Sequence, residues 1–359
     1  MPTAPRLSRR TWAAVLAVVL VVGLSVVAAR KAVPYVTFSP GPTVNVLGKY
    51  DDKAIIRVSG HPSYRDKGAM RLVTVIPSGP SQKVSIPTMV FAWLDPDRAV
   101  YPRSTLYGKA DTRQSVQQQS AAQMASSQDN AIASALGALH IPFDTKVGIA
   151  SVEKGGPADG HLEPGDIIVT VNGKDVSGVT QVTSAVRPLP VGSPVTMTVR
   201  RGGKLQRVAM TTTAAPDDPQ ASAIRVSIQA AGYTFPFKVE VKLNQNIGGP
   251  SAGMIFSMGI YDVLTPGSLT GGKAIAGTGE IDGEGHVSPI GGIQQKLVGA
   301  QSDGAKLFLV PADNCAEALG GHYDPKKMRL VKVTTLDDAV KDVRAWVKDP
   351  KAPLPRCTR

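Results

Sequence analysis

A long, uninterrupted apolar run lies near the start of the chain. Residues 11–29 carry no charged side chain and are rich in Val, Leu and Ala. Because a spanning helix needs about 20 such residues, the run predicts a single-pass transmembrane anchor over 11–29, after a cytoplasmic tail at 1–10. Arg9 and Arg10 favour the cytoplasmic side, which puts the remaining chain outside the cell membrane. A cleaved signal peptide is the alternative, because Val27-Ala28-Ala29 could serve as a small-residue cleavage site.

Short extended segments follow this run. They are expected at residues 35–38, 54–58, 70–76 and 88–93, separated by Gly/Pro turns. Residues 110–139 are rich in Gln, Ala and Ser and look helical, and both a coiled linker and an amphipathic connector fit that composition. We therefore expect a strand-rich juxtamembrane region with a helical connector over residues 30–125.

The next pattern, over residues 147–213, has short strands with strong turn signals. Its pieces are Val147-Gly148-Ile149-Ala150-Ser151-Val152, Gly156-Pro157-Ala158, Leu162-Glu163-Pro164-Gly165-Asp166-Ile167-Ile168 and Val171-Asn172-Gly173. Pro-Gly-Asp before an apolar strand and Asn-Gly between strands both favour tight turns. The pattern resembles a PDZ domain of the type attached to bacterial envelope proteases, expected here over 126–214. A generic small β-domain is the alternative.

By that resemblance, this domain binds an extended peptide by adding it to an exposed strand edge. We expect the groove between the strand at 147–152 and a helix at 180–186. The peptide-binding candidates are therefore Val147, Gly148, Ile149 and Ala150. The partners implied are unfolded or flexible protein substrates, including C-terminal peptides at the groove.

Candidate chemistry appears at residues 248–264. A tight Gly-Pro turn delivers Ser251 to the start of an apolar, helix-length run at 254–264. Since the N–H groups at a helix N-terminus are unpaired, an oxyanion formed beside Ser251 would be stabilised there. Serine is also a common helix N-cap, which is the structural alternative for Ser251.

A second helical pattern supplies a candidate base. Ile293, Lys296, Leu297 and Ala300 recur at the spacing i, i+3, i+4 and i+7, so Lys296 lies on an apolar stripe. A lysine in this position often extends its ammonium group to solvent. If it is held in apolar surroundings, however, it loses its proton more easily and can act as a general base near neutrality. A serine hydroxyl needs such a base to become a nucleophile.

Together these residues resemble the proteolytic domain of the Lon proteases, peptidase family S16. The matching pieces are Gly249-Pro250-Ser251-Ala252-Gly253, Thr278-Gly279-Glu280, Gly285-His286-Val287-Ser288-Pro289-Ile290-Gly291-Gly292 and Lys296. The resemblance implies a serine endopeptidase in which Ser251 is the nucleophile, Lys296 is the general base and Thr278 orients the lysine. Gly249, Pro250 and Ala252 would support the serine turn, and we read Glu280 as structural.

One departure from the Lon pattern keeps a second function open. Lon enzymes usually carry an acidic residue three positions before the serine, where this chain has Gly248. The alternative is therefore a catalytically weakened or inactive, membrane-tethered PDZ adaptor. A signal-peptidase-like enzyme also uses Ser-Lys chemistry, but the Pro-Ile-Gly-Gly-x-x-x-Lys pattern favours Lon. The histidines offer no better base, because His286 falls at a variable position of the motif.

The overall prediction is an α+β multidomain protein. Strands at 224–229 and 239–243 lead into the serine turn, and another at 305–311 follows the lysine helix. This alternation indicates a Lon-type α/β proteolytic domain over 220–348, followed by a C-terminal tail at 349–359. The Lon resemblance also suggests a ring-shaped homo-oligomer, namely a hexamer.

Composition and charge exclude some functions. The chain has 359 residues, is 42% hydrophobic and can bury more than one core. Its net charge is +12, but Arg6, Arg9, Arg10, Arg30 and Lys31 flank the apolar run, and no basic stretch interleaves with aromatic residues. Nucleic-acid binding is therefore not expected. No Cys/His cluster has metal-ligand spacing, so we expect neither a metal nor another cofactor.

Two further features concern the compartment and the energy source. Outside the cytoplasm, Cys315 and Cys357 can form a disulfide worth about 3 to 4 kcal/mol, although two unpaired thiols are the alternative. The sequence contains no G-x-x-x-x-G-K-[ST] phosphate loop. We therefore expect ATP-independent cleavage of chains that are already unfolded or flexible.

Overall fold

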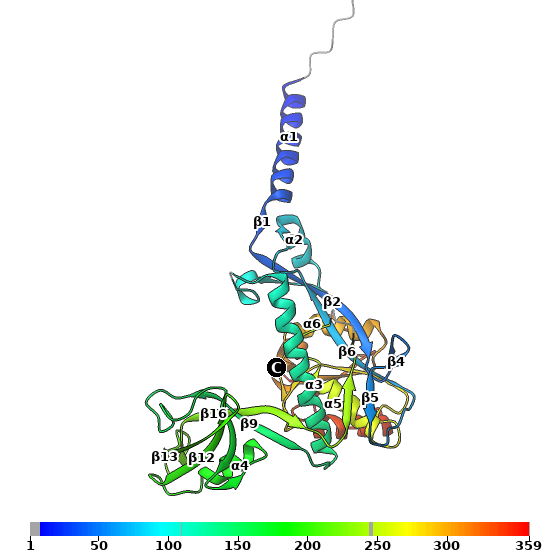
Figure 1. Cartoon of the computed structure of the whole chain (residues 1–359). Coiled ribbons are helices and arrows are strands. Elements are labelled where there is room, and N and C mark those ends of the chain that lie inside the picture. The colour runs from blue at the N-terminus through cyan, green and yellow to red at the C-terminus, as the bar shows by residue number, and fades with distance from the viewer. Residues whose placement is uncertain (1–7, 109, 244–246, 359) are drawn as a thin grey trace, which may run out of the picture.

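The computed structural model describes residues 8–108, 110–243 and 247–358. Figure 1 shows a long N-terminal helix, a layered α/β body and a smaller β-rich unit at the far end of the body. Helix α1 (Arg9–Arg30) begins after Ser8, whose hydroxyl accepts the Thr11 N–H. No part of its apolar stretch is buried, and its length and composition suit a membrane span. The predicted N-terminal apolar helix is thus present.

The body is built on a six-stranded mixed sheet with the strand order β22-β21-β18-β6-β2-β8. Its strands are β22 (Arg329–Val333), β21 (Leu307–Pro311), β18 (Ala274–Gly277), β6 (Ala69–Pro77), β2 (Tyr35–Asn45) and β8 (Ala99–Pro102). The first four in this order run parallel, and β2 and β8 each lie antiparallel to their neighbour. The predicted α+β architecture is confirmed.

This sheet joins two parts of the sequence that local patterns separate. β2, β6 and β8 come from residues 30–125, which we expected to form a region of their own. Instead β6 pairs with β18, and β18 comes from the Lon-like part of the chain. Hydrophobic periodicity reports only local structure, so it cannot reveal a pairing between such distant segments. The predicted domain limits remain predictions, but these strands are part of the body.

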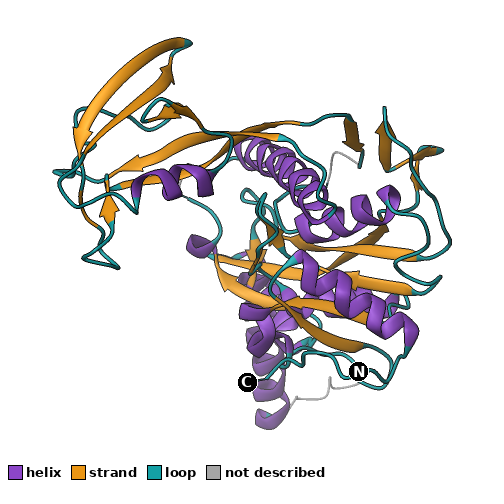
Figure 2. Ribbon diagram, turned by 90° about the horizontal axis from the view of Figure 1, so that it is seen from below, coloured by secondary structure: helices purple, strands orange, loops and turns teal. Residues whose placement is uncertain are grey.

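Helices cover both faces of the sheet, as Figure 2 shows. On one face lie α5 (Gly253–Leu264) and α8 (Leu336–Lys348), with α3 (Arg113–Ala138) packed over α5, and on the other lies α6 (Ile293–Ser302). Successive strand residues point to opposite faces. On β21, Leu307 and Leu309 therefore join the core around α5, while Phe308 and Val310 join the core around α6.

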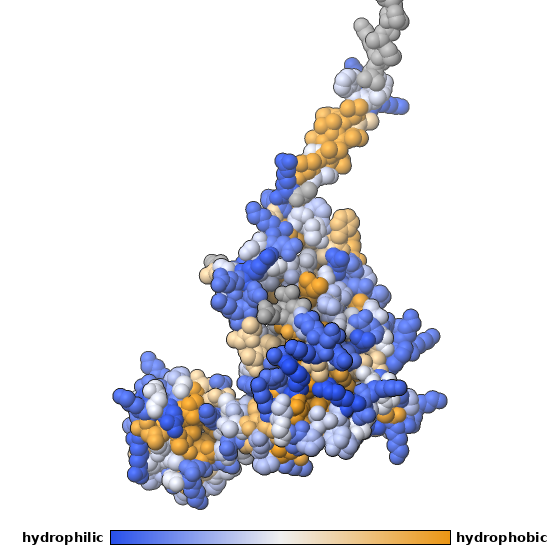
Figure 3. Space-filling view, turned by 45° about the vertical axis from the view of Figure 1, so that its right-hand side comes forward, coloured by the Kyte–Doolittle hydropathy of each residue, from blue (hydrophilic) through white to orange (hydrophobic). Residues whose placement is uncertain are grey.

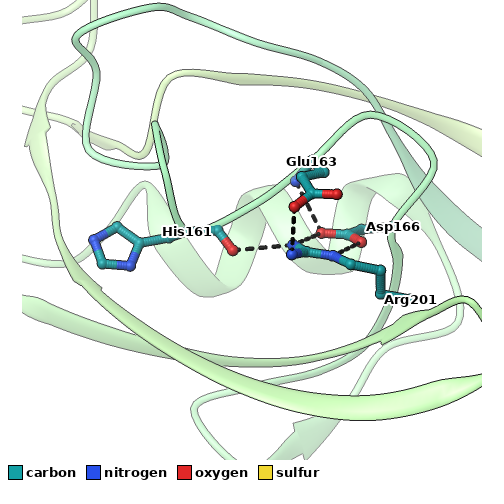
Figure 4. A network of polar contacts seen from close by, with 4 residues as sticks. All are labelled: His161, Glu163, Asp166 and Arg201. Carbon is teal, nitrogen blue, oxygen red and sulfur yellow. Dashed lines mark hydrogen bonds and ion pairs between the residues drawn. The ribbon is translucent and has the colours of Figure 1, made fainter.

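A second sheet, in the order β13-β12-β10-β9-β16, forms the smaller unit. Its elements are β9 (Asp144–Val152), β10 (Ile167–Val171), β12 (Pro194–Arg201), β13 (Lys204–Thr211), β16 (Val226–Thr234) and the helix α4 (Val179–Val186). Arg201 organises one loop of this unit (Figure 4): its guanidinium donates to both carboxylate oxygens of buried Asp166, to Glu163 and to the His161 carbonyl oxygen. The hydrogen bonds from Arg201 lower the pKa of the Asp166 carboxyl.

Two segments differ from the sequence-based expectation. Residues 88–93, expected to be extended, lie in helix α2 (Ile86–Leu94), where Ser85 caps the helix and Pro87 suits its first turn. The strand expected at 224–229 precedes the serine turn in the sequence but belongs to the smaller unit, because β16 pairs with β9. Neither the capped start of α2 nor the pairing of β16 follows from side-chain alternation alone.

The remaining elements are short. They are β1 (Ala32–Val33), β3 (Lys49–Tyr50), β4 (Lys53–Ala54), β5 (Ile56–Ser59), β7 (Val84–Ser85), η1 (Arg103–Thr105), β11 (Lys174–Asp175), β14 (Thr213–Ala214), β15 (Ser222–Ala223), β17 (Lys238–Val241), β19 (Glu280–Ile281), β20 (Val287–Ser288), η2 (Ala312–Asn314) and α7 (Cys315–Ala318).

The C-terminal segment is fastened to the body. The Sγ atoms of Cys315 and Cys357 lie 2.01 Å apart and form a disulfide. Leu354 packs into the core around α5, and the Lys332 N–H donates to the Pro355 carbonyl oxygen. The bridge therefore closes a segment that is already packed against β22.

Replacing Cys357 with Ser is expected to lower the free energy of unfolding by about 3 to 4 kcal/mol, because the unfolded chain regains the entropy that the bridge removes. Unfolding in guanidinium chloride measures the difference between the two proteins. Dithiothreitol should lower the midpoint of the wild type and leave that of Cys357→Ser unchanged. Equal midpoints for the oxidised wild type and the variant would contradict a stabilising bridge.

Candidate active site

Ser251 lies in the turn that leads into the buried helix α5. Gly249 has a φ of 89°, a left-handed conformation that favours glycine, and Pro250 follows it. The N-cap of α5 is Ala252, and no side chain caps the helix there. The serine is therefore not used as an N-cap, which was its structural alternative.

Backbone donors are available around this serine. Among the described residues, the N–H groups of Ser251 and Ala252 have no hydrogen-bond acceptor. By contrast, the Gly253 N–H donates to the Pro250 carbonyl and the Met254 N–H to the Gly279 carbonyl. Two unpaired donors at the positive end of α5 are suited to stabilise a negatively charged oxygen.

Lys296 lies inside the body and not at its surface. It is carried by α6 and is 2% exposed. Its Nζ donates a hydrogen bond of 3.1 Å to Thr278 Oγ1. The Thr278 hydroxyl donates in turn to the Ser251 carbonyl oxygen at 2.9 Å, and the Gly279 N–H donates to the same oxygen at 2.9 Å. Thr278, which directly follows β18, thereby connects the lysine to the serine backbone.

Burial changes the protonation of this lysine. The loss of hydration lowers the pKa of Lys296 to about 7, although the carboxylates of Glu280 and Glu317 act in the opposite direction. Burial also raises the pKa values of these two carboxyl groups. A lysine with a pKa near 7 is uncharged in a large share of the molecules at neutral pH. It can then accept a proton.

The side chains of Ser251 and Lys296 are not hydrogen-bonded to each other, although Thr278 connects Lys296 to the Ser251 backbone. Both belong to the described part of the chain, and their side chains share no hydrogen bond there. Hydrogen bonds between a nucleophile and its base are often long without substrate and shorten only in the reacting complex. The arrangement is thus compatible with a dyad that closes when substrate binds.

Helix α3, which lies outside the sequence motif, packs directly on the serine turn. The Ser120 carbonyl accepts the Gly249 N–H at 3.1 Å, and Ser127 Oγ donates to the Pro250 carbonyl at 2.9 Å. A Cβ placed on Gly248 would lie 2.8 Å from Ser120 Cβ. An acidic side chain at position 248 would therefore require α3 to move. The glycine at 248 is matched to this close packing.

A pocket of about 280 Å³ lies beside the turn. It is lined by Gln123, Ser126, Ser127 and Asn130 of α3, together with Pro250, Glu280 and Ile281. The sequence analysis missed the residues that α3 contributes. The Gln- and Ser-rich composition of residues 110–139 indicates a helix, but it does not indicate contact with the serine turn.

The strand pairing of the smaller unit differs from the sequence-based expectation. Strand β9 pairs with β10 on one side and β16 on the other, so Val147, Gly148, Ile149 and Ala150 do not lie at a free edge. The two end strands of this sheet are β13 and β16. A pocket of about 440 Å³ lies between the start of β16 and α4, and its lining includes Val182, Thr183, Val186, Ile224, Val226 and Ile228. Residues 147–150 therefore offer no free edge on which an added peptide strand could pair.

No metal centre is found in the structurally described part of the chain, where no group of three or more His, Cys, Asp or Glu side chains is placed to hold an ion. His286, the histidine of the Lon-like motif, is exposed and contacts Asp282 through Nδ1 at 2.9 Å. Lys296 is therefore the base candidate that is hydrogen-bonded to the serine turn through Thr278.

Comparison with known families assigns both units. Residues 120–212 match the PDZ domain family, and residues 244–344 match the Lon protease (S16) C-terminal proteolytic domain. This protein joins a PDZ domain to a Lon-type proteolytic domain. The PDZ assignment covers the smaller sheet from β9 to β13, and the Lon assignment covers the serine turn, Thr278 and Lys296.

Two individual relatives are Lon proteases that each match about a quarter of this chain. The Lon protease of Azospirillum brasilense is 38% identical over 94 residues, which are 26% of this chain and 11% of that protein. The Lon protease of Paraburkholderia phytofirmans is 36% identical over 96 residues, or 26% of this chain and 12% of that protein. The chain thus spans a small part of the length of these relatives. A solved PDZ domain of an SdrC-like protein from Listeria monocytogenes is 22% identical, with a TM-score of 0.22, over 24% of this chain and 90% of that domain.

The buried lysine has a measurable cost in stability. Its pKa falls from 10.5 to about 7 on folding, so the unfolded chain binds the proton more tightly. Folding is therefore disfavoured by about 4 kcal/mol at pH 7, and this penalty disappears as the pH rises toward the pKa of the unfolded chain. Lys296→Met is accordingly expected to raise the thermal midpoint at pH 7, and to raise it less at pH 10.

The matched control is Lys204→Met, because Lys204 is an exposed lysine of the PDZ domain. Calorimetry of both variants at the two pH values should show a gain only for Lys296→Met. No gain at either pH would mean that Lys296 is charged or hydrated in the folded protein.

Proposed function

We propose that this protein is a serine endopeptidase in which Ser251 and Lys296 form the catalytic dyad. The observation that carries the proposal is the burial of Lys296 against Thr278, whose hydroxyl donates to the Ser251 backbone. This arrangement gives the serine a base with a pKa near 7. The match to a Lon-type proteolytic domain supports the same class of activity.

In the proposed reaction, neutral Lys296 accepts the hydroxyl proton of Ser251 while Oγ attacks the carbonyl carbon of the peptide bond. The N–H groups of Ser251 and Ala252 stabilise the oxyanion of the tetrahedral intermediate. The lysine ammonium then gives its proton to the leaving amine, and an acyl ester remains on Ser251. Water, deprotonated by Lys296, hydrolyses the ester and restores the enzyme.

The PDZ domain is proposed to select or gate the substrate. An extended peptide would add to the edge of β16, with its apolar side chains in the pocket between β16 and α4. Two arginines lie at this pocket, Arg187 paired with Asp217 at 3.1 Å and Arg225 paired with Glu153 at 3.4 Å. The carboxylate of a C-terminal peptide would compete with Asp217 and Glu153 for these guanidinium groups.

We also propose that α1 anchors the protein in the cell membrane with the catalytic domain outside the cytoplasm. Figure 3 shows the apolar band of α1 with hydrophilic residues at both of its ends, and Arg9 and Arg10 precede it. The sequence has no phosphate loop, which supports cleavage without ATP. We further propose a homo-oligomer in the form of a hexameric ring, which rests on the Lon resemblance alone.

The adaptor alternative depends on Gly248, and the packing of α3 weakens it. Ser120 lies where a side chain at position 248 would be, so the glycine has a structural reason that is independent of catalysis. The absence of an acidic residue is therefore not evidence for a lost activity. We retain the protease as the proposed function.

The full chain in detergent is expected to cleave casein, an unfolded substrate, without ATP. Ser251→Ala and Lys296→Met should each reduce cleavage by at least about 1000-fold, because dyad members act as a unit. The wild-type rate should rise with pH through about 7, since Lys296 must lose its proton to act as a base.

Gel assays and labelling with a serine-reactive probe measure these effects. Cleavage that persists in Ser251→Ala would mean that another residue is the nucleophile. A wild-type protein that neither cleaves casein nor reacts with the probe would favour the adaptor.

The PDZ groove has a test of its own. Thr183 lines the pocket, whereas Ser184 is exposed and lies outside the lining. Thr183→Glu is expected to weaken binding of C-terminal peptides by about tenfold, or ~1.4 kcal/mol, because it places a negative charge beside the peptide carboxylate. Ser184→Glu is the matched control and should bind like the wild type. Fluorescence anisotropy with labelled peptides measures both, and equal losses in the two variants would place the binding site elsewhere.

A further inference from the structure

Helix α2 presents an unusual apolar face. Trp93, Phe91 and Leu94 are 74%, 72% and 66% exposed, which makes them the most exposed large apolar side chains outside α1 in the described part of the chain. Val90 is exposed beside them. At 100° per residue, these four positions share one side of the helix, and Ala92 alone is buried beneath them. A continuous apolar face of this kind marks an interaction surface.

The position of α2 identifies what this face contacts. Helix α2 lies beside the lower end of α1 (Figure 1) and packs against it. The chain that leaves α1 forms β1, and β1 pairs with β7 directly before α2, with Ala32 opposite Ser85 and Val33 opposite Val84. The apolar face of α2 is thus held next to the end of the membrane-spanning segment.

We propose that α2 is a membrane-seating helix that lies in the outer interface of the bilayer, with Phe91, Trp93 and Leu94 inserted among the lipids. This inference rests on the proposed anchoring role of α1. Tryptophan is enriched at the membrane–water interface because its ring is apolar and its N–H is polar. Lys31 and Lys83 are exposed at the same junction, where their ammonium groups can meet lipid phosphates.

The second contact changes what the anchor does. A single spanning helix would leave the body free to tilt and rotate, whereas α1 and α2 together fix two points. The pairing of β1 with β7 connects both points, and α2 also packs on β2 and β8 of the six-stranded sheet. The PDZ domain lies at the opposite end of the body (Figure 1). The two membrane contacts of α1 and α2 therefore hold the PDZ domain away from the bilayer, where it can bind soluble substrates.

Spin labels on the full chain in nanodiscs of phosphatidylcholine and phosphatidylglycerol test this inference. The native cysteines are joined in a disulfide, so a label reacts at an introduced cysteine. Phe91→Cys and Trp93→Cys report on α2. Leu20→Cys reports on α1, and Leu205→Cys is the matched control, an exposed leucine of the PDZ domain. Molecular oxygen concentrates in lipid and a nickel chelate in water, so their effects on each label measure its surroundings.

Labels at positions 91 and 93 are expected to be several-fold more accessible to oxygen than to the chelate. The label at position 20 should behave in the same way. The label at position 205 should be more accessible to the chelate than to oxygen. Aqueous labels at 91 and 93 with a lipid-exposed label at 20 would overturn the inference and leave the anchor intact. An aqueous label at 20 would overturn the anchor, and the membrane seat with it. Labels at 91 and 93 shielded from both reagents would show that a neighbouring copy of the chain covers α2, which also overturns it.

Discussion

The burial of one lysine depends on the whole architecture of the body. Lys296 is held in a low-dielectric site because α6 packs against the sheet, and the strands beneath α6 are β2 and β6. Both strands come from the N-terminal part of the chain, next to the apolar helix α1. The lysine pKa near 7 is therefore a product of segments that lie far apart in sequence. A fragment limited to the Lon-like residues would lack the strands that cover this helix.

Helix α3 connects the serine turn to the PDZ domain. It contacts the turn through Ser120 and Ser127, and it leads directly toward β9 of the PDZ sheet. On the same helix Asn130 accepts a hydrogen bond of 2.9 Å from the Tyr233 hydroxyl of β16. One helix thus contacts both the serine turn and an end strand of the PDZ sheet.

Local sequence patterns were sufficient where the chemistry is local. Spacing within a single element predicts three features that the structure contains. They are the Gly-Pro-Ser turn, the position of Lys296 on an apolar stripe and the long apolar helix α1. Residues 88–93, expected as a strand, form part of helix α2. Their apolar side chains also suit an extended chain, whereas the N-cap at Ser85 favours a helix. The free edge expected at residues 147–150 is absent because β16, from a later part of the chain, pairs with β9.

The sequence by itself determined which residues can do chemistry, since a serine after a Gly-Pro turn and a lysine among apolar residues are properties of short segments. Only the tertiary structure decided their surroundings. Thr278 connects Lys296 to the serine turn, Ser120 occupies the space beside Gly248, and β16 and α4 line one pocket at the end of the PDZ sheet. Each of these contacts joins segments that are distant in sequence, so it exists only once the sheet is assembled and the helices are packed on it.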